Sequence, residues 1–476
     1  MLSDAVQATH SQVPLNDFSR QLLLPQMYSY AGPRMAKGDI NGNGLDDLYL
    51  GGGKGQTGQV LIQTKQRKFV PKPQPDFQQD ALCTDTDAVF FDTDGDRDLD
   101  LYVVSGGYEY MPDDLLLQNR FYKNDGKGNF TKDAEALEPD NQADNSVETL
   151  DYDYDGDLNL FVTGSVIPFQ YPRAYASWVY ENNKGKFTKV DQPVFADLGI
   201  LNDAVIMDFD KDGYPDMVAV GDWTDAIYLK NNKGTFKRES LYAPTGLWQR
   251  IVAEDFDKDG DMDLVVGNYG LNTQWKASAG QPMTLNYADF DGNGKIDPIL
   301  SYYIQGVNYP AYSRDELLDQ LAGLRKKYTN YDLYSVATTD DILKALGNPT
   351  HETRQVTTLS TVYLVNNGGQ FTEKPFPIQA QFSPIFALLS HDLNHDGYPD
   401  LLLGGNQSHG RVRIGNTDAN FGQLFLNDRK GNFLYVPQHQ SGLQLRGDVR
   451  DFMTSNNWLI AGINNQKYEA YTLKKP

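Results

Sequence analysis

Seven short stretches of the sequence gather aspartate and asparagine at alternate positions of a tight turn. The run 208-DFDKDGYPD-216 has aspartate at its positions one, three, five and nine, and glycine at position six. This alternation points carboxylate oxygens at one centre, and the glycine permits a left-handed backbone that turns the position-seven carbonyl inward. Oxygen ligands of this kind bind hard cations, so the sequence predicts calcium in these loops. Without the cation, the clustered carboxylates repel one another.

The predicted calcium ligands are the side chains at positions one, three, five and nine of each loop. They are Asp39, Asn41, Asn43 and Asp47; Asp92, Asp94, Asp96 and Asp100; Asp151, Asp153, Asp155 and Asn159; Asp208, Asp210, Asp212 and Asp216; Asp255, Asp257, Asp259 and Asp263; Asp289, Asp291, Asn293 and Asp297; and Asp392, Asn394, Asp396 and Asp400. Six loops have glycine at position six, and Arg97 is the exception. The first loop has only two carboxylates and is the weakest candidate. A few loops without an ion remain an alternative, because aspartate and asparagine favour turns by themselves.

The sequence around the loops distinguishes them from EF-hands. An EF-hand needs a glutamate at position twelve and a helix on each side, whereas position twelve is apolar in all seven loops here. Strand-like runs such as 86-TDAVFF and 401-LLLGGN precede and follow the loops. We therefore expect β-hairpins, each closed by a metal loop.

A second hairpin follows most of the loops. Its signature is a strand, an Asn/Gly turn and a phenylalanine, as in 122-YKNDGKGNF, 180-YENNKGKF and 425-FLNDRKGNF. Two hairpins make a four-stranded antiparallel unit, and a tandem array of such units predicts an all-β fold, the β-propeller. The spacing of the loops predicts seven blades in a single domain, 1–476. Eight blades, with the fifth reduced to two strands, is the alternative.

The fifth and sixth loops interrupt the regular spacing. We interpret 271–355 as an insertion into the fifth blade, with the sixth loop on an extra hairpin and two short helices. The first helix follows a capping box formed by Ser313 and Glu316, and the second opens at Thr338. The last blade lacks an acidic loop, and we expect a strand from the other terminus to close it, because a propeller must join its ends.

Composition limits the classes of protein. The chain has 476 residues, a net charge of −22 and one cysteine, Cys83, so no internal disulfide can form. The charge is concentrated in the loops, which leaves no footprint for nucleic acid. No apolar run is long enough for a transmembrane segment. The first residues lack a secretory signal, so we expect either a cytoplasmic protein or one whose leader has been removed.

The loops with their flanks, such as 204-AVIMDFDKDGYPDMVAV and 253-AEDFDKDGDMDLVVGN, resemble the FG-GAP/VCBS repeats of integrin α-subunit-type propellers. Other stretches, including 267-GNYGLNTQWKAS and 309-YPAYSRDELLDQL, are similar to the Bacteroidota VCBS-repeat proteins related to the ASPIC/UnbV and cartilage-acidic-protein families. The resemblance implies calcium at the loop positions named above, with Asn41, Asn43 and Asn159 weakening their sites. It also implies an exported or surface lipoprotein, extracellular or at the cell surface and associated with the outer membrane.

No catalytic motif accompanies the loops. His391 and His395 flank or lie within the seventh loop and are interpreted as surface histidines. We therefore favour a non-catalytic binding or assembly module for a glycan or protein partner, including other domains or outer-membrane proteins of a parent assembly. The alternative is a calcium-dependent polysaccharide lyase that acts on uronate-containing glycans. Among the tryptophans, Trp223 and Trp275 stand among polar residues and are expected to be the exposed pair.

Overall fold

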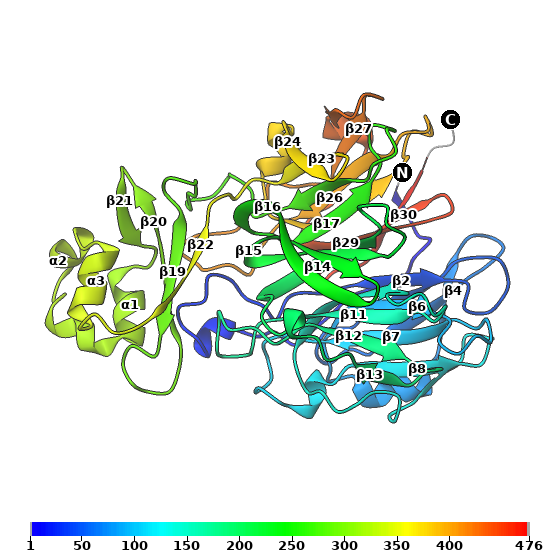
Figure 1. Cartoon of the computed structure of the whole chain (residues 1–476), viewed down its shortest axis with the longest axis horizontal. Coiled ribbons are helices and arrows are strands. Elements are labelled where there is room, and N and C mark those ends of the chain that lie inside the picture. The colour runs from blue at the N-terminus through cyan, green and yellow to red at the C-terminus, as the bar shows by residue number, and fades with distance from the viewer. Residues whose placement is uncertain (1, 474–476) are drawn as a thin grey trace.

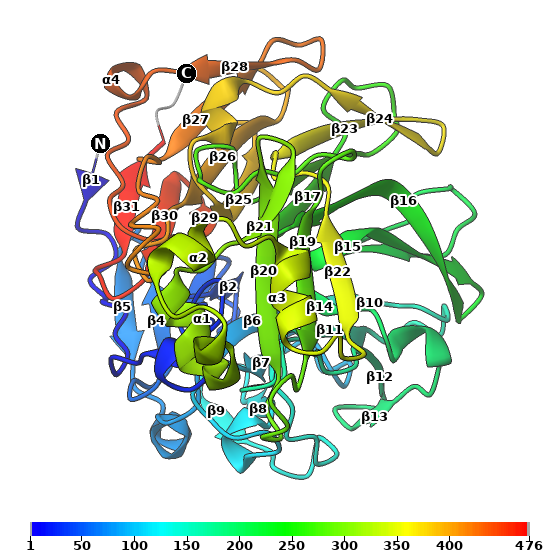
Figure 2. The same cartoon turned by 90° about the vertical axis from the view of Figure 1, so that its left-hand side faces the viewer.

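Antiparallel hairpins dominate the structure, a computed structural model that describes residues 2–473. Seven sheets, here called blades 1 to 7, contribute their first strands to a closed ring in which β2, β6, β10, β14, β17, β25 and β29 contact one another in that order, and β29 contacts β2. In Figure 2 the chain colours run round the axis of this ring. The all-β propeller fold predicted from the repeats is confirmed.

The strands of the ring are as follows. Blades 1 to 4 contain β2 (Met35–Gly38), β3 (Asp47–Leu50), β4 (Gln59–Gln63) and β5 (Phe69–Lys72); β6 (Asp85–Phe91), β7 (Asp100–Ser105), β8 (Arg120–Asn124) and β9 (Phe130–Lys132); β10 (Asp144–Leu150), β11 (Asn159–Gly164), β12 (Trp178–Asn182) and β13 (Phe187–Lys189); and β14 (Ile200–Met207), β15 (Asp216–Asn232) and β16 (Thr235–Leu247). Blades 5 to 7 contain β17 (Arg250–Glu254), β18 (Asp263–Gly267), β23 (Val362–Asn367) and β24 (Gln370–Lys374); β25 (Ile385–His391), β26 (Asp400–Gly405), β27 (Gln423–Asn427) and β28 (Phe433–Val436); and β29 (Val449–Ser455), β30 (Trp458–Ile463), β31 (Glu469–Thr472) and β1 (Leu2–Ser3).

Both chain ends meet in blade 7. Strand β1 pairs antiparallel with β31, so that Leu2 lies opposite Tyr471. The expected strand from the other terminus is therefore present, and the N- and C-terminal ends lie close together in Figure 1. This pairing joins the ends of the ring through backbone hydrogen bonds and leaves no open gap between the first and last blades.

The insertion is a separate sheet that leaves the ring after β18 and returns at β23. Strand β23 pairs with β18, which completes blade 5 across the insertion. The inserted sheet has the order β21-β20-β19-β22 and comprises β19 (Met283–Ala288), β20 (Asp297–Ile304), β21 (Val307–Pro310) and β22 (Glu352–Val356). It therefore holds more than the expected hairpin, because two further strands flank β19 and β20.

Three short α-helices accompany the inserted sheet, one more than expected. They are α1 (Arg314–Gln320), α2 (Tyr331–Ser335) and α3 (Thr339–Ala345). The capping boxes at Ser313 and Thr338 are both formed. Helix α1 ends at Gln320 and continues as the 3-10 turn η5 (Ala322–Lys326). The other short elements are η1 (Asp17–Ser19), η2 (Pro75–Asp80), η3 (Leu115–Leu117), η4 (Pro193–Phe195), η6 (Ile378–Gln381) and α4 (Gln438–Ser441).

Apolar side chains fill the space between neighbouring blades. Between blades 2 and 3, for example, the ring centroids of Phe187 and Phe121 are 5.3 Å apart, and Phe187 also packs with Tyr102. The second strands are buried on both faces, which explains their continuous apolar runs. The largest apolar cluster lies elsewhere, between one end of the ring and the insertion. Figure 1 shows the insertion standing on that side of the ring.

This arrangement overturns the expectation that Trp223 and Trp275 are exposed. Their exposed fractions are 5% and 3%, and both belong to the apolar cluster beneath the insertion. Trp275 packs on Tyr269, and the Trp223 indole donates a hydrogen bond to Tyr171. Polar neighbours in sequence suggested solvent contact, but the insertion and residues 17–31 cover this end of the ring. Both indole rings are therefore buried against that cover and are not exposed to a ligand.

Candidate metal-binding loops

Six of the seven acidic loops lie at the end of the ring opposite the insertion. The sixth loop joins β19 and β20 of the insertion. Each ring loop joins the first and second strands of its blade, and the Asn/Gly turns of the four-stranded blades join the third and fourth strands, so antiparallel pairing brings them to the same end. In the three-stranded blade 4, the turn between β15 and β16 lies at this end as well, because the backbone N–H of Asn231 donates to Asp216 of the loop. The insertion joins the second and third strands of blade 5 and thus leaves from the other end.

The seven loops share one backbone geometry. Positions four and six are left-handed in every loop, with φ between 59 and 96°, such as 60° at Lys211 and 96° at Gly213. Arg97 takes the same conformation without being glycine, with φ 74°. Sequence reasoning expected this geometry only at position six. Glycine at position four of three loops, Gly42, Gly95 and Gly292, was the signal that would have found the second left-handed position.

Position one organises each turn through the backbone. Asp208 accepts hydrogen bonds from the backbone N–H groups of Asp212 and Gly213, at 3.0 and 2.9 Å. Asp392 accepts the equivalent pair from Asp396 and Gly397, at 3.0 and 2.9 Å. The turns are therefore held in shape by their first carboxylate, and their carboxylates at positions three and five are brought toward the same centre.

Carboxylate oxygens converge in five of the loops. Three carboxylates in each have oxygens within 4.8 Å of one another: Asp92, Asp94 and Asp96; Asp151, Asp153 and Asp155; Asp208, Asp210 and Asp216; Asp255, Asp257 and Asp259; and Asp289, Asp291 and Asp297. The first and seventh loops replace one or two of these carboxylates by amides, and in the first loop the Asn41 amide donates to Asp47 at 2.6 Å. His395 is exposed and His391 is partly buried beside the seventh loop.

The donor set fits a hard cation. Clustered carboxylate oxygens repel one another, and a divalent ion bound by oxygen ligands relieves that repulsion. Asp151 adds an independent sign, because its Oδ1 atom is buried and has no hydrogen-bond partner within the described residues. In a calcium site, Asp151, Asp153 and Asp155 would bind the ion at positions one, three and five.

Position nine connects each loop to the second hairpin of its blade. Asp263 is fully buried, and one of its oxygens accepts a hydrogen bond of 2.8 Å from the backbone N–H of Asn366 on β23. Burial raises the pKa of Asp263 to about 6, although hydrogen bonds from Asn366 and Tyr363 oppose the rise. Asp216 and Asp400 make the same bond, to Asn231 and Asn427. A cation near these oxygens would favour their ionised form.

Asparagine side chains then link each loop to its neighbour around the ring. The Asn231 amide donates to the backbone carbonyl of Tyr152, at position two of the preceding loop, at 2.7 Å. Asn427 makes the equivalent bond to Phe256 at 2.7 Å, and Asn124 to Ile40 at 2.8 Å. The Asn/Gly turns identified in the sequence thus do more than reverse the chain, a role that sequence reasoning missed.

The axis of the ring holds a second set of acidic residues that sequence reasoning missed. Asp87, Asp203 and Asp451 each accept a backbone N–H from the next blade, at 3.0, 2.9 and 2.8 Å. They line a cavity of about 400 Å³ together with Glu148 and Arg250. These carboxylates lie on first strands at small irregularities in strand register, so only the assembled ring brings them together.

Comparison with known proteins agrees with the repeat pattern. The family model described as FG-GAP-like repeat matches residues 39–103, 92–162 and 208–266. No curated protein matches the sequence. The family model does not match the rest of the chain, which includes the insertion.

The solved structures that match the chain share little sequence with it. The V. cholerae biofilm matrix protein Bap1 is 10% identical with a TM-score of 0.38, and the match covers 99% of this chain and 91% of that one. YCF48 bound to D1 peptide is 9% identical with a TM-score of 0.43, and the match covers 98% of each chain.

Each repeat match begins at the first residue of one acidic loop and ends in the strand after the next acidic loop, so the three matches contain five of the seven loops. Within residues 2–473, no helix is both long and apolar enough to cross a membrane. The chain contains three FG-GAP-like repeats and folds as a β-propeller.

Proposed function

We propose that this chain is a seven-bladed, calcium-stabilised propeller that acts outside the cell or at its surface as a binding or assembly module for a glycan or protein. The observation that carries the proposal is the shared geometry of the seven loops, with left-handed backbone at positions four and six in each. Seven copies of one oxygen-rich turn are a costly arrangement without a cation, because their carboxylates repel one another.

The proposed location fits the calcium affinity that is typical of extracellular modules. Extracellular calcium modules bind the ion with dissociation constants of about 10⁻⁴ to 10⁻³ M, which fits the concentrations outside cells. FG-GAP repeats are typical of extracellular or surface proteins, which agrees with this location. Within the Bacteroidota branch suggested by the sequence, association with the outer membrane would follow, and we propose that as well.

The loop end of the ring is the end available to a partner, since the insertion covers the other. Tyr154 at position four of the third loop is 63% exposed and lies edge-on to Tyr214 at position seven of the fourth, with ring centroids 5.1 Å apart. Exposed aromatic rings stack on sugar rings and anchor protein partners. We propose that a glycan or protein contacts this pair, and that calcium acts by fixing the two loops that carry it.

The experiment compares binding by calcium-loaded protein and two variants on an immobilised panel of neutral and uronate-containing polysaccharides. Tyr214→Ala should weaken binding by roughly tenfold, the value of one aromatic anchor. Tyr331→Ala, a matched change of an exposed tyrosine on the insertion, should leave binding unchanged. Equal loss in both variants would contradict a site on the loops.

The same panel tests the non-catalytic role. Ultraviolet absorbance is followed while the calcium-loaded protein is incubated with each uronate polysaccharide. We expect no rise. A rise from unsaturated products that a chelator abolishes would show a polysaccharide lyase and overturn the proposal.

A further inference from the structure

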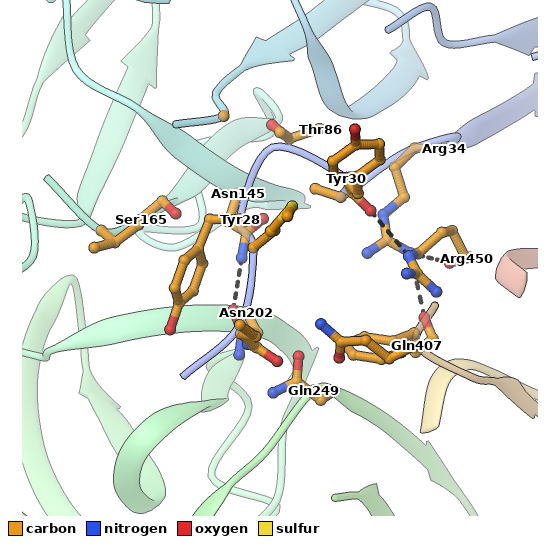
Figure 3. Close-up of a pocket in the computed structure, with 16 residues that line it drawn as sticks. Tyr28, Tyr30, Arg34, Thr86, Asn145, Ser165, Asn202, Gln249, Gln407 and Arg450 are labelled. Carbon is orange, nitrogen blue, oxygen red and sulfur yellow. Dashed lines mark hydrogen bonds between the residues drawn. The ribbon is translucent and has the colours of Figure 1, made fainter. Parts of the chain in front are cut away.

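A small cavity lies on the axis of the ring near the insertion, beneath the N-terminal residues 26–34 (Figure 3). Its volume is about 60 Å³. Since a water molecule occupies about 30 Å³ of liquid, this volume suits two waters or one ligand of a few heavy atoms. The cavity is distinct from the six acidic loops of the ring, which lie at its opposite end.

Neutral amides and two arginines line this axial cavity. Asn145 lies on β10 of blade 3, Asn202 lies on β14 of blade 4, Gln249 directly precedes β17 of blade 5, and Gln407 follows β26 within blade 6. Arg34 and Arg450 complete the wall (Figure 3). The lining contains no aspartate or glutamate. This is unusual for a chain of net charge −22, and it gives the cavity a positive character.

The two arginines differ in how their charges are balanced. Arg450 pairs with Asp448 at 3.2 Å and donates further hydrogen bonds to backbone carbonyls. Arg34 forms no ion pair within residues 2–473, and its exposed fraction is only 7%. It donates through one nitrogen to the carbonyls of Phe386 and Arg450. Asp451, Asp87 and Asp203 act on its charge at longer range, but none of these carboxylates forms an ion pair with it.

Two residues of the cavity lining, Arg34 and Gln407, have polar atoms without a hydrogen-bond partner in the part of the chain that the structure describes. The Arg34 Nε–H has no acceptor, and the Gln407 Oε1 has no donor, within the described residues. Gln407 is 4% exposed, so its amide is closed off from bulk water. The two ends of a glutamine amide are interchangeable by rotation, and the NH₂ end of Gln407 can therefore face an acceptor in the cavity. Burial is the main cause that lowers the pKa of Arg34 to about 9; Arg250 lowers this pKa further, whereas Asp451, Asp87 and Asp203 act in the opposite direction.

We propose that this axial cavity binds a small carboxylate anion of the size of formate or acetate, held by Arg34 and Gln407. The anion would supply the acceptor for the Arg34 Nε–H, in a charge-assisted hydrogen bond. Such a site is independent of the calcium loops and of the partner proposed for them. Its size excludes ligands much larger than a few heavy atoms.

Saturation-transfer NMR of the calcium-loaded protein tests this site with acetate and with acetamide, its uncharged analogue of the same shape. We expect saturable binding of acetate and roughly tenfold weaker binding of acetamide, since hydrogen bonds to charged groups are the stronger ones. Equal binding of the two, or no saturable signal from acetate, would overturn the proposal, the second outcome leaving only water in the cavity.

Two variants and one control place the anion at the cavity. Arg34→Met and Gln407→Leu should each weaken acetate binding, the first by roughly tenfold or more. Arg173→Met changes an exposed arginine outside the lining and should leave it unchanged. Gln407→Leu keeps the proposal testable if Arg34→Met does not fold, because it removes no charge. Acetate binding that is the same in Gln407→Leu and Arg173→Met would contradict a site in this cavity.

Discussion

The two ends of the ring are built on different principles. The loop end repeats one polar turn in six of the seven blades, and hydrogen bonds from asparagine side chains join neighbouring turns. The insertion end is unique in sequence and is closed by the largest apolar cluster of the described chain. On our proposal, stability at the first end depends on ions, whereas stability at the second end depends on buried apolar area. The difference predicts that calcium removal affects one end and leaves the packing of the other intact.

The largest expected effect of a single substitution lies at the insertion end. Trp275→Ala removes a ring that is 3% exposed and packs on Tyr269. We expect a loss of about 3–5 kcal/mol in the free energy of unfolding, because truncation of a buried aromatic leaves a cavity. Denaturant unfolding should give the same loss in calcium and in chelator. Tyr331→Ala, which removes an exposed ring, serves as the control. A loss of stability in Trp275→Ala that disappears in chelator would contradict the distinction between the two ends.

A smaller effect is expected from the links between loops. Asn231→Ala leaves the Tyr152 carbonyl without its side-chain donor, and Asn231 is fully buried. The expected cost is about 1–3 kcal/mol, the value of a buried group left unsatisfied. Unfolding of Asn231→Ala, Asp153→Asn and the double variant measures whether the link and the third loop are coupled. Strict additivity in calcium would show that the link does not transmit ion binding between blades.

Removal of one calcium ligand should act only when calcium is present. Asp257→Asn at position three of the fifth loop is expected to cost about 1–2 kcal/mol in calcium and almost nothing in chelator, since ion binding adds stability only to the folded state. Thermal unfolding in both conditions checks this. The matched change Asp319→Asn, at an exposed carboxylate on α1 that pairs with Arg325, should have no calcium-dependent effect.

The smallest effect concerns the one loop without glycine at position six. Arg97 has φ 74°, a conformation that costs a residue with a side chain about 1–2 kcal/mol relative to glycine. Arg97→Gly should therefore stabilise the protein by about 0.5–1 kcal/mol after the greater flexibility of glycine in the unfolded chain is counted. Urea unfolding resolves such a change. Destabilisation by Arg97→Gly would mean that the arginine side chain contributes contacts that outweigh its backbone strain.

The sequence predicted the repeated end of the molecule far better than the unique end. Alternating aspartates, the glycine at position six and the Asn/Gly turn recur in most blades, so local chemistry alone was sufficient to predict the loops and their sheets. The burial of Trp223 depends on contacts with residues far away in sequence, and no local pattern reports such contacts. The same holds for Arg34, whose cavity forms only when several blades and residues 26–34 meet on the axis.

The most direct measurement of the central claim is the calcium content and melting temperature of one preparation before and after chelation. The account predicts several bound ions per chain, up to seven, and a fall in Tm of about 10 °C on chelation, because each ion lost removes about 1–2 kcal/mol from a domain of this size. Added calcium should restore the Tm. A preparation with no bound calcium, or a Tm that chelation leaves unchanged, would contradict a stabilising role for the loops.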